Sequence, residues 1–288
     1  MPISQNIINL YDSFTHGVID RRAFMERLTK LAGGATAATV LLATLQNNYA
    51  LAGIVAEDDA RLAAGLTTLP GPDGAIKTYV ASLKDIAKRP AIIVVHENRG
   101  LNAHIKDIAR RVALEGFIAI APDLLSSAGG TPANEDTARD MIGKLDAAKA
   151  VTALVAAVAY AKGLANASGK VGAIGFCWGG GMTNQLAVHA PDLAAAVAYY
   201  GPQPTAADVP KIKASLMLHY AGKDERIGAG IAAYEAALKA AKADYQLFVY
   251  DGVQHAFNND TNAARYDKIA AELAWARTVT FLKAKLAG

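Results

Sequence analysis

The chain has 288 residues, 52% of them hydrophobic, and its formal net charge is only +3. A chain of this length can bury a sizeable core, and α/β folds of this size often form one domain. It has no dense Lys/Arg stripe and no interleaved aromatic and basic residues, which argues against a nucleic-acid partner. After residue 60 no run of apolar residues is long enough to span a membrane.

The cysteine and histidine content also limits the function classes. The single cysteine excludes an intramolecular disulfide and a cysteine-based zinc site. The six histidines show neither HxH nor HExxH spacing. The sequence therefore supports no metal site, and we expect no cofactor.

The first 52 residues differ from the rest of the chain. They contain Arg21-Arg22, a weakly apolar run from about residue 31 to residue 45, and the small-residue sequence Ala50-Leu51-Ala52. Together these features resemble a twin-arginine export signal. On this interpretation the segment is removed and the protein is periplasmic or exported.

A helical arm that stays attached is the alternative interpretation of this segment. Phe24, Leu28 and Leu31 have helical spacing and fit either case. An attached arm would pack on the body or on a partner subunit of a homodimer, and the protein would be cytoplasmic. We divide the chain into an N-terminal extension over residues 1–55 and one catalytic domain over residues 56–288.

The body alternates strands and helices in chain order. Continuous apolar runs predict buried strands at 91–97, 117–121, 170–176, 195–201, 214–222 and 245–252. Helical periodicity predicts helices over 102–115, 134–163, 178–190, 229–242 and 261–286. This alternation predicts an α/β fold with a mostly parallel sheet and helices on both faces. A TIM barrel would need eight evenly spaced units, which the chain does not supply.

A candidate nucleophile lies between the third of these strands and the next helix. Residues 175–179 read Gly-Phe-Cys-Trp-Gly, which is the G-x-C-x-G pattern of a nucleophile elbow. Such a turn lifts the Cys177 side chain above the sheet and places the Trp178 N–H where it can stabilise an oxyanion. A helix N-terminus also favours a thiolate. The alternative is a buried structural cysteine in a Gly-rich turn.

Two later strands end near a candidate acid and a candidate base. Asp224 follows the strand at 214–222, and His255 follows the strand at 245–252. The order nucleophile, acid, histidine is that of α/β-hydrolases, in which the histidine acts as base and the acid orients it. Asp251 is a competing acid, although Asp251-Gly252 fits ordinary turn chemistry. His219 lies inside an apolar strand and fits a satisfied core histidine.

A polar loop follows the first buried strand. In α/β-hydrolases this loop supplies the second oxyanion N–H, here that of Asn98. Glu97 either pairs with Arg99 or Arg110, or faces Cys177 and accepts its S–H hydrogen bond. His16, in the N-terminal segment, and the histidines at 96, 104 and 189 lack a position after a late strand.

These motifs together resemble the dienelactone hydrolase family over about residues 70–286. The segments that carry the resemblance are HENRGLN (96–102), APDL (121–124), GFCWGGG (175–181), AGKDERI (221–227) and QHAF (254–257). The resemblance implies an α/β-hydrolase that opens an ester or enol-lactone through a thioester. It implies a triad of Cys177, Asp224 and His255, with Glu97 holding the resting thiol and the N–H groups of Asn98 and Trp178 as the oxyanion hole.

One departure from the family bears on the substrate. Dienelactone-specific members carry arginines after the PDL motif and just after the catalytic histidine, where this chain has residues 125–127 (Leu-Ser-Ser) and 257–259 (Phe-Asn-Asn). Losing a cationic clamp should weaken selection of an anionic substrate, unless Arg99 substitutes for it. The leading hypothesis is a cysteine-nucleophile ester or lactone hydrolase. The alternatives are a non-catalytic ligand-binding relative and a thiol redox sensor, which would lack a resolving cysteine.

Overall fold

The computed structural model describes residues 3–85 and 87–287. Its eight strands form one sheet, in the spatial order β1-β2-β4-β3-β5-β6-β7-β8. In chain order the strands are β1 (Leu62–Gly71), β2 (Gly74–Leu83), β3 (Arg89–Val95), β4 (Ile118–Pro122), β5 (Ala167–Phe176), β6 (Ala195–Tyr199), β7 (Ser215–Ala221) and β8 (Tyr245–Tyr250). The strands from β4 to β8 across the sheet pair in parallel, while β1–β2 and β2–β4 pair antiparallel.

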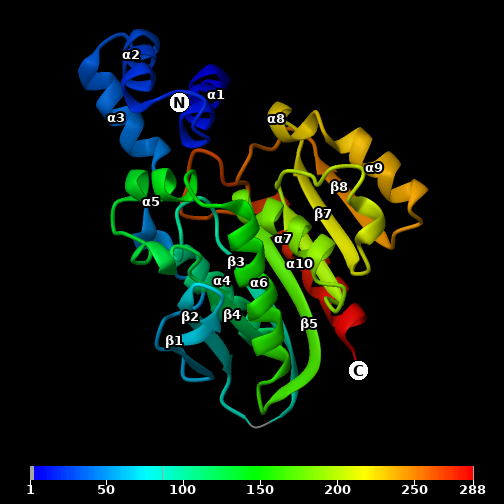
Figure 1. Ribbon diagram of the computed structural model, residues 1–288. Helices are drawn as coiled ribbons and strands as arrows, with labels where there is room; N and C mark the ends of the chain where they lie inside the picture. Colours follow the sequence, from blue (N-terminus) through cyan, green and yellow to red (C-terminus); the bar gives the residue numbers. More distant parts are fainter. Residues whose placement is uncertain (1–2, 86, 288) are drawn as a thin grey trace.

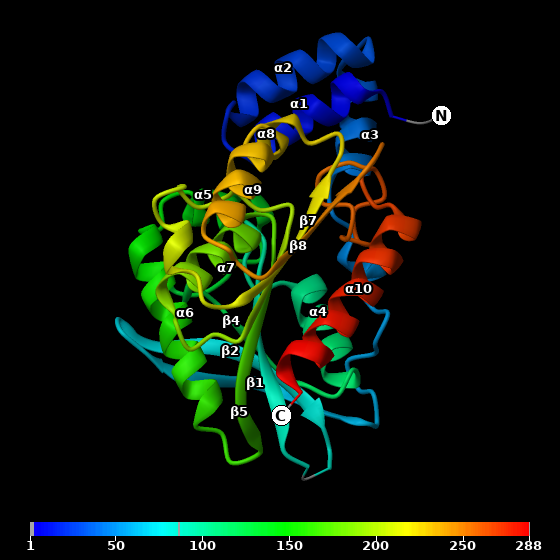
Figure 2. The same cartoon turned by 90° about the vertical axis from the view of Figure 1, so that its right-hand side faces the viewer.

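Helices cover both faces of this sheet, as predicted. The helices are α1 (Gln5–Thr15), α2 (Arg21–Ala32), α3 (Ala35–Leu45), α4 (Ala103–Leu114), α5 (Glu135–Ile142), α6 (Ala147–Lys162), α7 (Trp178–His189), α8 (Glu225–Gly228), α9 (Ile231–Ala240) and α10 (Lys268–Leu286). Figures 1 and 2 show α4 and α10 on one face and α6, α7 and α9 on the other. A separate apolar core fills each of these two interfaces. The α/β-hydrolase architecture is therefore confirmed.

Two predicted helices differ from the observed ones. The predicted helix over 134–163 is interrupted between α5 and α6, because the Asp146 side chain accepts the N–H groups of Ala148 and Lys149 and starts a new helix. The predicted helix over 261–286 begins only at Lys268, where Asp267 caps it by accepting the N–H of Ala270. The residues before that cap are left free to form the loop that carries His255.

The β1–β2 hairpin was not predicted from the sequence. Most β1 side chains are exposed, so the strand shows no alternation of apolar and polar residues. Its register with β2 comes from the backbone ladder, which runs from Leu62 opposite Leu83 to Gly71 opposite Gly74.

The N-terminal extension forms three helices with a small core of their own. This core contains Phe14, Phe24, Leu28 and Leu45, and Phe14 stacks on Phe24 with ring centroids 4.6 Å apart. The three helices, which we call the arm, lie above the end of the sheet at which the parallel strands finish (Figures 1 and 2). Of the described helices none alone is long and apolar enough to cross a membrane, although α2 and the residues 35–51, bent by 112°, meet the length and composition together.

Candidate active site

Cys177 lies in the turn between β5 and α7, at the centre of the sheet. Its backbone has φ 55° and ψ −118°, a region that residues with a Cβ seldom adopt. The turn is tight because two glycines allow close approach. A Cβ on Gly175 would lie 2.1 Å from the Gly179 carbonyl oxygen, and one on Gly179 would lie 2.3 Å from that of His96. The local sequence therefore forces the Cys177 side chain out of the strand.

Asp224 and His255 meet at the ends of β7 and β8. His255 Nδ1 donates to Asp224 Oδ2 at 2.5 Å, and both side chains are buried. The other Asp224 oxygen accepts the Ile227 N–H at 3.1 Å as the cap of α8. Asp224 is thus both a helix cap and the partner of the histidine, and the cap fixes the carboxylate toward the ring.

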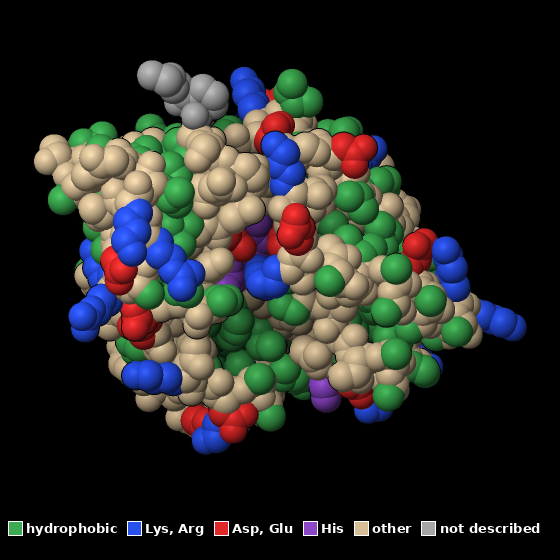
Figure 3. All heavy atoms as spheres, turned by 90° about the horizontal axis from the view of Figure 1, so that it is seen from above, with side chains coloured by type: hydrophobic (Ala, Val, Ile, Leu, Met, Phe, Trp, Pro, Cys, Tyr) green, Lys and Arg blue, Asp and Glu red, His purple; other side chains and the backbone are tan. Residues whose placement is uncertain are grey.

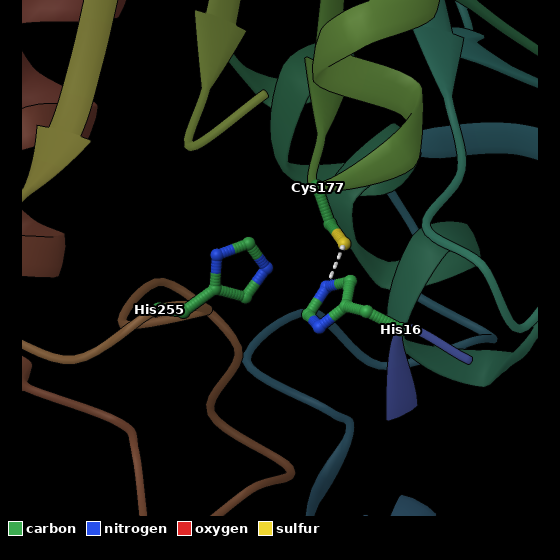
Figure 4. A group of neighbouring side chains, drawn as sticks. All are labelled: His16, Cys177 and His255. Atoms are coloured by element: carbon green, nitrogen blue, oxygen red, sulfur yellow. Dashed lines mark hydrogen bonds between the residues drawn. The ribbon is translucent and has the colours of Figure 1, made fainter. Parts of the chain in front are cut away.

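His255 faces Cys177 with its second nitrogen. Among the described residues, His255 Nε2 is buried and has no hydrogen-bond partner. A ring nitrogen of His255 lies within 4.8 Å of the Cys177 sulfur (Figure 4). The competing acid, Asp251, is exposed in the turn after β8. His219 is a core histidine as expected, bonded to Tyr250 and Thr278.

A third residue at the thiol comes from the arm. His16 follows α1 and its Nε2 lies 3.4 Å from the Cys177 sulfur (Figure 4). Its ring is 4.8 Å from that of His255 and perpendicular to it. The sequence did not point to His16, because it lies in the N-terminal segment and not after a late strand, and a contact across 161 residues leaves no trace in local spacing. The helical spacing of Phe24, Leu28 and Leu31 did indicate a packed arm, and Phe24 and Leu28 lie in its core, but this spacing does not reach His16.

The charges of this cluster favour a thiolate. Burial by itself raises the pKa of the Cys177 thiol, but the positive charges of His255 and His16 outweigh it and lower the pKa to about 6. Burial by itself lowers the pKa of His255, but the charges of Cys177 and Asp224 outweigh it and raise the pKa to about 10. The charges of the two histidines thus favour the thiolate form of Cys177, and the charges of Cys177 and Asp224 favour the protonated form of His255.

The reactivity of the single thiol should report this shift. We expect the rate of Cys177 alkylation by iodoacetamide to rise with pH around a midpoint of about 6, because the thiolate is the reactive form. The same protein unfolded in urea should show a midpoint of about 8.5, the ordinary value of a free cysteine. Measuring both pH profiles tests the shift, and coincident profiles would contradict it.

The two residues predicted to supply the oxyanion hole, Asn98 and Trp178, line the same cavity as Cys177. Trp178 is the first residue of α7, so its N–H has no intrahelical acceptor. Asn98 follows β3 in the loop that lines the same pocket as Cys177 and His255. Neither N–H is engaged in the turn and loop hydrogen bonds of the described residues.

Glu97 occupies neither of the positions predicted for it. Its carboxylate is buried and accepts hydrogen bonds from Asn259 Nδ2 at 2.8 Å and from the Tyr200 hydroxyl at 3.5 Å. Within the described part of the chain it forms no ion pair with Arg99 or Arg110 and no hydrogen bond with the thiol. Arg99 donates to the Glu135 carbonyl oxygen at 3.3 Å, while its side chain lines the pocket at Cys177.

A cavity opens from the sulfur to the surface. It has a volume of about 480 Å³ and lies between the arm and the body. Its lining includes His16, Cys177, Trp178, Ile142 and Pro202. From above, histidine side chains lie deep in a recess with acidic and basic side chains around its rim (Figure 3). The cavity can admit a small substrate to the thiol.

The same three side chains could also hold a metal ion. One ligand atom from each of His16, Cys177 and His255 lies within 4.8 Å of the other two. One thiolate and two imidazoles form a donor set that zinc accepts. The sequence supported no metal site, because it has one cysteine and no HxH or HExxH spacing; these three side chains come together from segments far apart in the chain, which such spacing does not show.

The fold and this site define an α/β-hydrolase with a cysteine in the strained turn between β5 and α7. Residues 76–286 match the model of the dienelactone hydrolase family, and residues 2–33 match a model described as YqhI-like. The chain belongs to the dienelactone hydrolase family and is a hydrolase.

Individual relatives agree with this assignment. A protein of Methylorubrum extorquens named "Putative carboxymethylenebutenolidase" is 34% identical over 282 residues, covering 88% of this chain and 96% of its own. A Klebsiella pneumoniae structure described as "Putative Dienelactone Hydrolase" is 30% identical, with a TM-score of 0.69, and the match covers 78% of this chain and 98% of that one. The dienelactone hydrolase of Anabaena variabilis shares the fold at 18% identity, with a TM-score of 0.62 over 78% of this chain and 99% of that one.

Proposed function

We propose that the protein hydrolyses small carboxylic esters or lactones through a Cys177–His255–Asp224 triad and a thioester intermediate. The observation that carries the proposal is the buried Asp224–His255 pair, whose unpartnered Nε2 lies beside a thiol on a strained elbow. Family membership supports hydrolysis, and this geometry supports the finer mechanism.

Acylation would begin with the thiolate. The Cys177 sulfur attacks the carbonyl carbon, and the negative charge moves to the carbonyl oxygen, which faces the N–H groups of Asn98 and Trp178. When the tetrahedral intermediate collapses, the bond to the alcohol oxygen breaks. That oxygen takes the proton from His255 Nε2, leaving a thioester and a neutral imidazole.

Deacylation would use the same histidine as a base. Neutral His255 removes a proton from water as the water oxygen attacks the thioester carbonyl. The carbon–sulfur bond then breaks, which releases the acid and restores the thiolate and the imidazolium. Asp224 holds the Nδ1 proton of His255 throughout and stabilises its positive charge.

Trapping the intermediate tests this mechanism. The protein is mixed with p-nitrophenyl acetate, quenched in acid and analysed by intact mass and peptide mapping. We expect one acetyl group on the peptide that contains Cys177, and none in the Cys177→Ala variant. Turnover without a Cys177 adduct would overturn the thioester, and the absence of both turnover and adduct would favour the non-catalytic ligand-binding alternative.

The charges around the cavity bear on the substrate. Arg139, which lines it, is engaged by Asp136 and Asp140 and lies 4.3 Å over the Phe14 ring. Arg226 lies 3.9 Å from Asp12. Lys144 is the remaining cation of the lining; it is exposed and forms no ion pair among the described residues. Because both arginines already have partners, and an exposed lysine is a hydrated charge without the fixed fork of an arginine, we expect kcat/KM for an anionic dienelactone to lie within about tenfold of that for a neutral lactone of the same size. A substrate panel measures this ratio, and a much larger preference for the anion would show that a carboxylate clamp exists.

Export of the protein and its assembly as a homodimer stay predictions. Cleavage after Ala52 would remove the arm and with it His16. N-terminal sequencing of the mature protein from its host tests cleavage, since a first residue of Gly53 would support it and an intact terminus on exported protein would contradict it. Light scattering of the purified protein tests the dimer.

A further inference from the structure

The arm places a second histidine on the sulfur of Cys177. His16 and His255 approach this sulfur from two segments that lie on either side of it (Figure 4). We propose that His16 is a second catalytic histidine, which holds the Cys177 sulfur as a thiolate in the resting enzyme and is itself oriented by Asp12. This inference rests on the proposed role of Cys177 as nucleophile.

Asp12 sets the proton positions on the His16 ring. The Asp12 carbonyl oxygen lies 2.8 Å from His16 Nδ1, and a carboxylate oxygen of Asp12 lies 3.3 Å from the same nitrogen. Both oxygens can only accept, so Nδ1 carries a proton. His16 Nε2 therefore accepts the S–H when the ring is neutral and donates to the thiolate when it is protonated. The carboxylate contact is longer than that of Asp224 with His255, 3.3 Å against 2.5 Å, so the Asp12 carbonyl oxygen is the nearer acceptor for His16.

Several contacts hold His16 in this place. Asn98 Nδ2 donates to the Thr15 carbonyl oxygen at 2.8 Å, which ties the arm to the loop of the proposed oxyanion hole. Arg265 lies 3.6 Å from the Asp12 carboxylate, and Gln5 bonds Gln254 next to His255 at 3.0 Å. These contacts link both ends of α1 to loops of the site. The docking of the arm on the body therefore fixes the position of His16.

His16 fills a role that the sequence suggested for Glu97. The Glu97 carboxylate is turned to Asn259 and Tyr200, whereas His16 Nε2 is at hydrogen-bond distance from the sulfur. The two side chains would have opposite effects on the protonation of Cys177. A carboxylate beside the thiol would favour its protonated form, and an imidazolium favours the thiolate.

The surrounding charges are mixed in sign. Besides His255, Asp224 and Asp12, the charged side chains that line the pockets around Cys177 and His16 are those of Glu97, Arg99, Arg139, Asp140, Lys144, Arg226 and Arg265. Burial lowers the pKa of His16, but the Cys177 charge and the Asp12 hydrogen bond outweigh it and raise the pKa above its ordinary value. The sulfur and Asp12 thus favour the charged form of His16.

The role predicts a specific kinetic signature. When the sulfur attacks, its negative charge moves to the carbonyl oxygen, so the hydrogen bond from His16 is strongest in the resting state. His16 should therefore set the fraction of thiolate at low pH rather than the limiting rate at high pH. A residue that only packs in the cavity would shift neither pH profile.

The experiment compares the full-length wild type with His16→Gln, Asp12→Asn and the matched control His189→Gln, an exposed histidine bonded within its own helix. Iodoacetamide alkylation and p-nitrophenyl acetate hydrolysis are measured across pH. At pH 6 both rates should fall about fivefold in His16→Gln and less in Asp12→Asn, because a rise of one unit in the Cys177 pKa, from about 6, lowers the thiolate fraction at that pH from about one half to about one eleventh. At high pH both variants should approach wild type, as His189→Gln does at every pH.

Three outcomes would overturn the proposal. Superimposed alkylation profiles in wild type and both variants would show that His16 does not act on the thiol. Faster hydrolysis in His16→Gln at every pH, without a shift in profile, would show that His16 only obstructs the site. One zinc per chain, with a chelator changing the wild-type profile, would make the histidines metal ligands. Asp12→Asn keeps His16 in place, so it decides the question if His16→Gln fails to fold.

A failure of this inference can be told apart from a failure of the proposed function. Alkylation reports the state of the thiol without any turnover. If Cys177→Ala hydrolyses the ester as wild type does, the nucleophile assignment fails while the alkylation profiles still show whether His16 acts on the sulfur.

Discussion

Replacing Cys177 with alanine is expected to lower kcat for p-nitrophenyl acetate by at least about a thousandfold, since no other group can form the acyl intermediate. The side chain is small and buried, and alanine keeps the Cβ in the same strained turn. The loss should therefore appear in activity rather than in folding. Steady-state hydrolysis together with the near-UV circular dichroism spectrum measures both.

Cys177→Ser is the informative companion variant. It keeps a nucleophilic atom at the elbow, but a serine hydroxyl is not ionised by the neighbouring imidazoles as a thiol is. Its kcat should lie between those of wild type and Cys177→Ala. If Cys177→Ala hydrolyses the ester within about tenfold of wild type, the nucleophile is another group.

Asp224→Asn should lower kcat by about a hundredfold to ten-thousandfold near neutral pH. The positive charge of His255 and its hydrogen bond outweigh the effect of burial and lower the pKa of Asp224, so the carboxylate is ionised in any such assay. Asparagine removes this charge. If its oxygen keeps the cap on Ile227, its amide N–H₂ faces His255 Nδ1 and favours the wrong tautomer.

Asp251→Asn is the matched control for this change. Asp251 is the nearest acid in sequence before His255, and its side chain is exposed. The control should retain kcat within about twofold, because exposed substitutions away from the site have small effects. Equal losses in the two variants, or none in either, would contradict the assignment of Asp224 as the orienting acid.

The alternating part of the fold could be predicted because its signals are local. Strands β3 to β7 contain short apolar runs bounded by turn residues, and a strand buried on both faces requires such a run. The strand predicted as buried at 245–252 is the edge strand β8, in which only Tyr250 is buried. The break at Asp146 and the late start of α10 at Lys268 depend on single side-chain caps within otherwise helical sequence. The spacing of apolar residues does not reveal such caps. This explains why the break near Asp146 and the start of α10 at Lys268 were both predicted wrongly.

The residues of the candidate site also fall into those that local motifs predicted and those that depend on tertiary contacts. Cys177, Asp224 and His255 were placed at strand ends from the elbow motif and chain order, and parallel strands bring those ends to one edge of the sheet. Whether Glu97 faced the thiol could not be read from spacing. Its partners, Asn259 and Tyr200, approach from two other loops of the site.

The sequence by itself determined the fold class, the family and the identity of the candidate nucleophile. Each of these can be recognised from short segments of the chain: apolar runs, helical periodicity and motifs such as Gly-Phe-Cys-Trp-Gly at 175–179. Only the tertiary structure decided what surrounds the sulfur. The arm has its own small core, and polar contacts dock it over the site, so His16 meets a thiol 161 residues away. Such a contact depends on how the folded arm packs against the body of the protein, and no local sequence pattern specifies that packing.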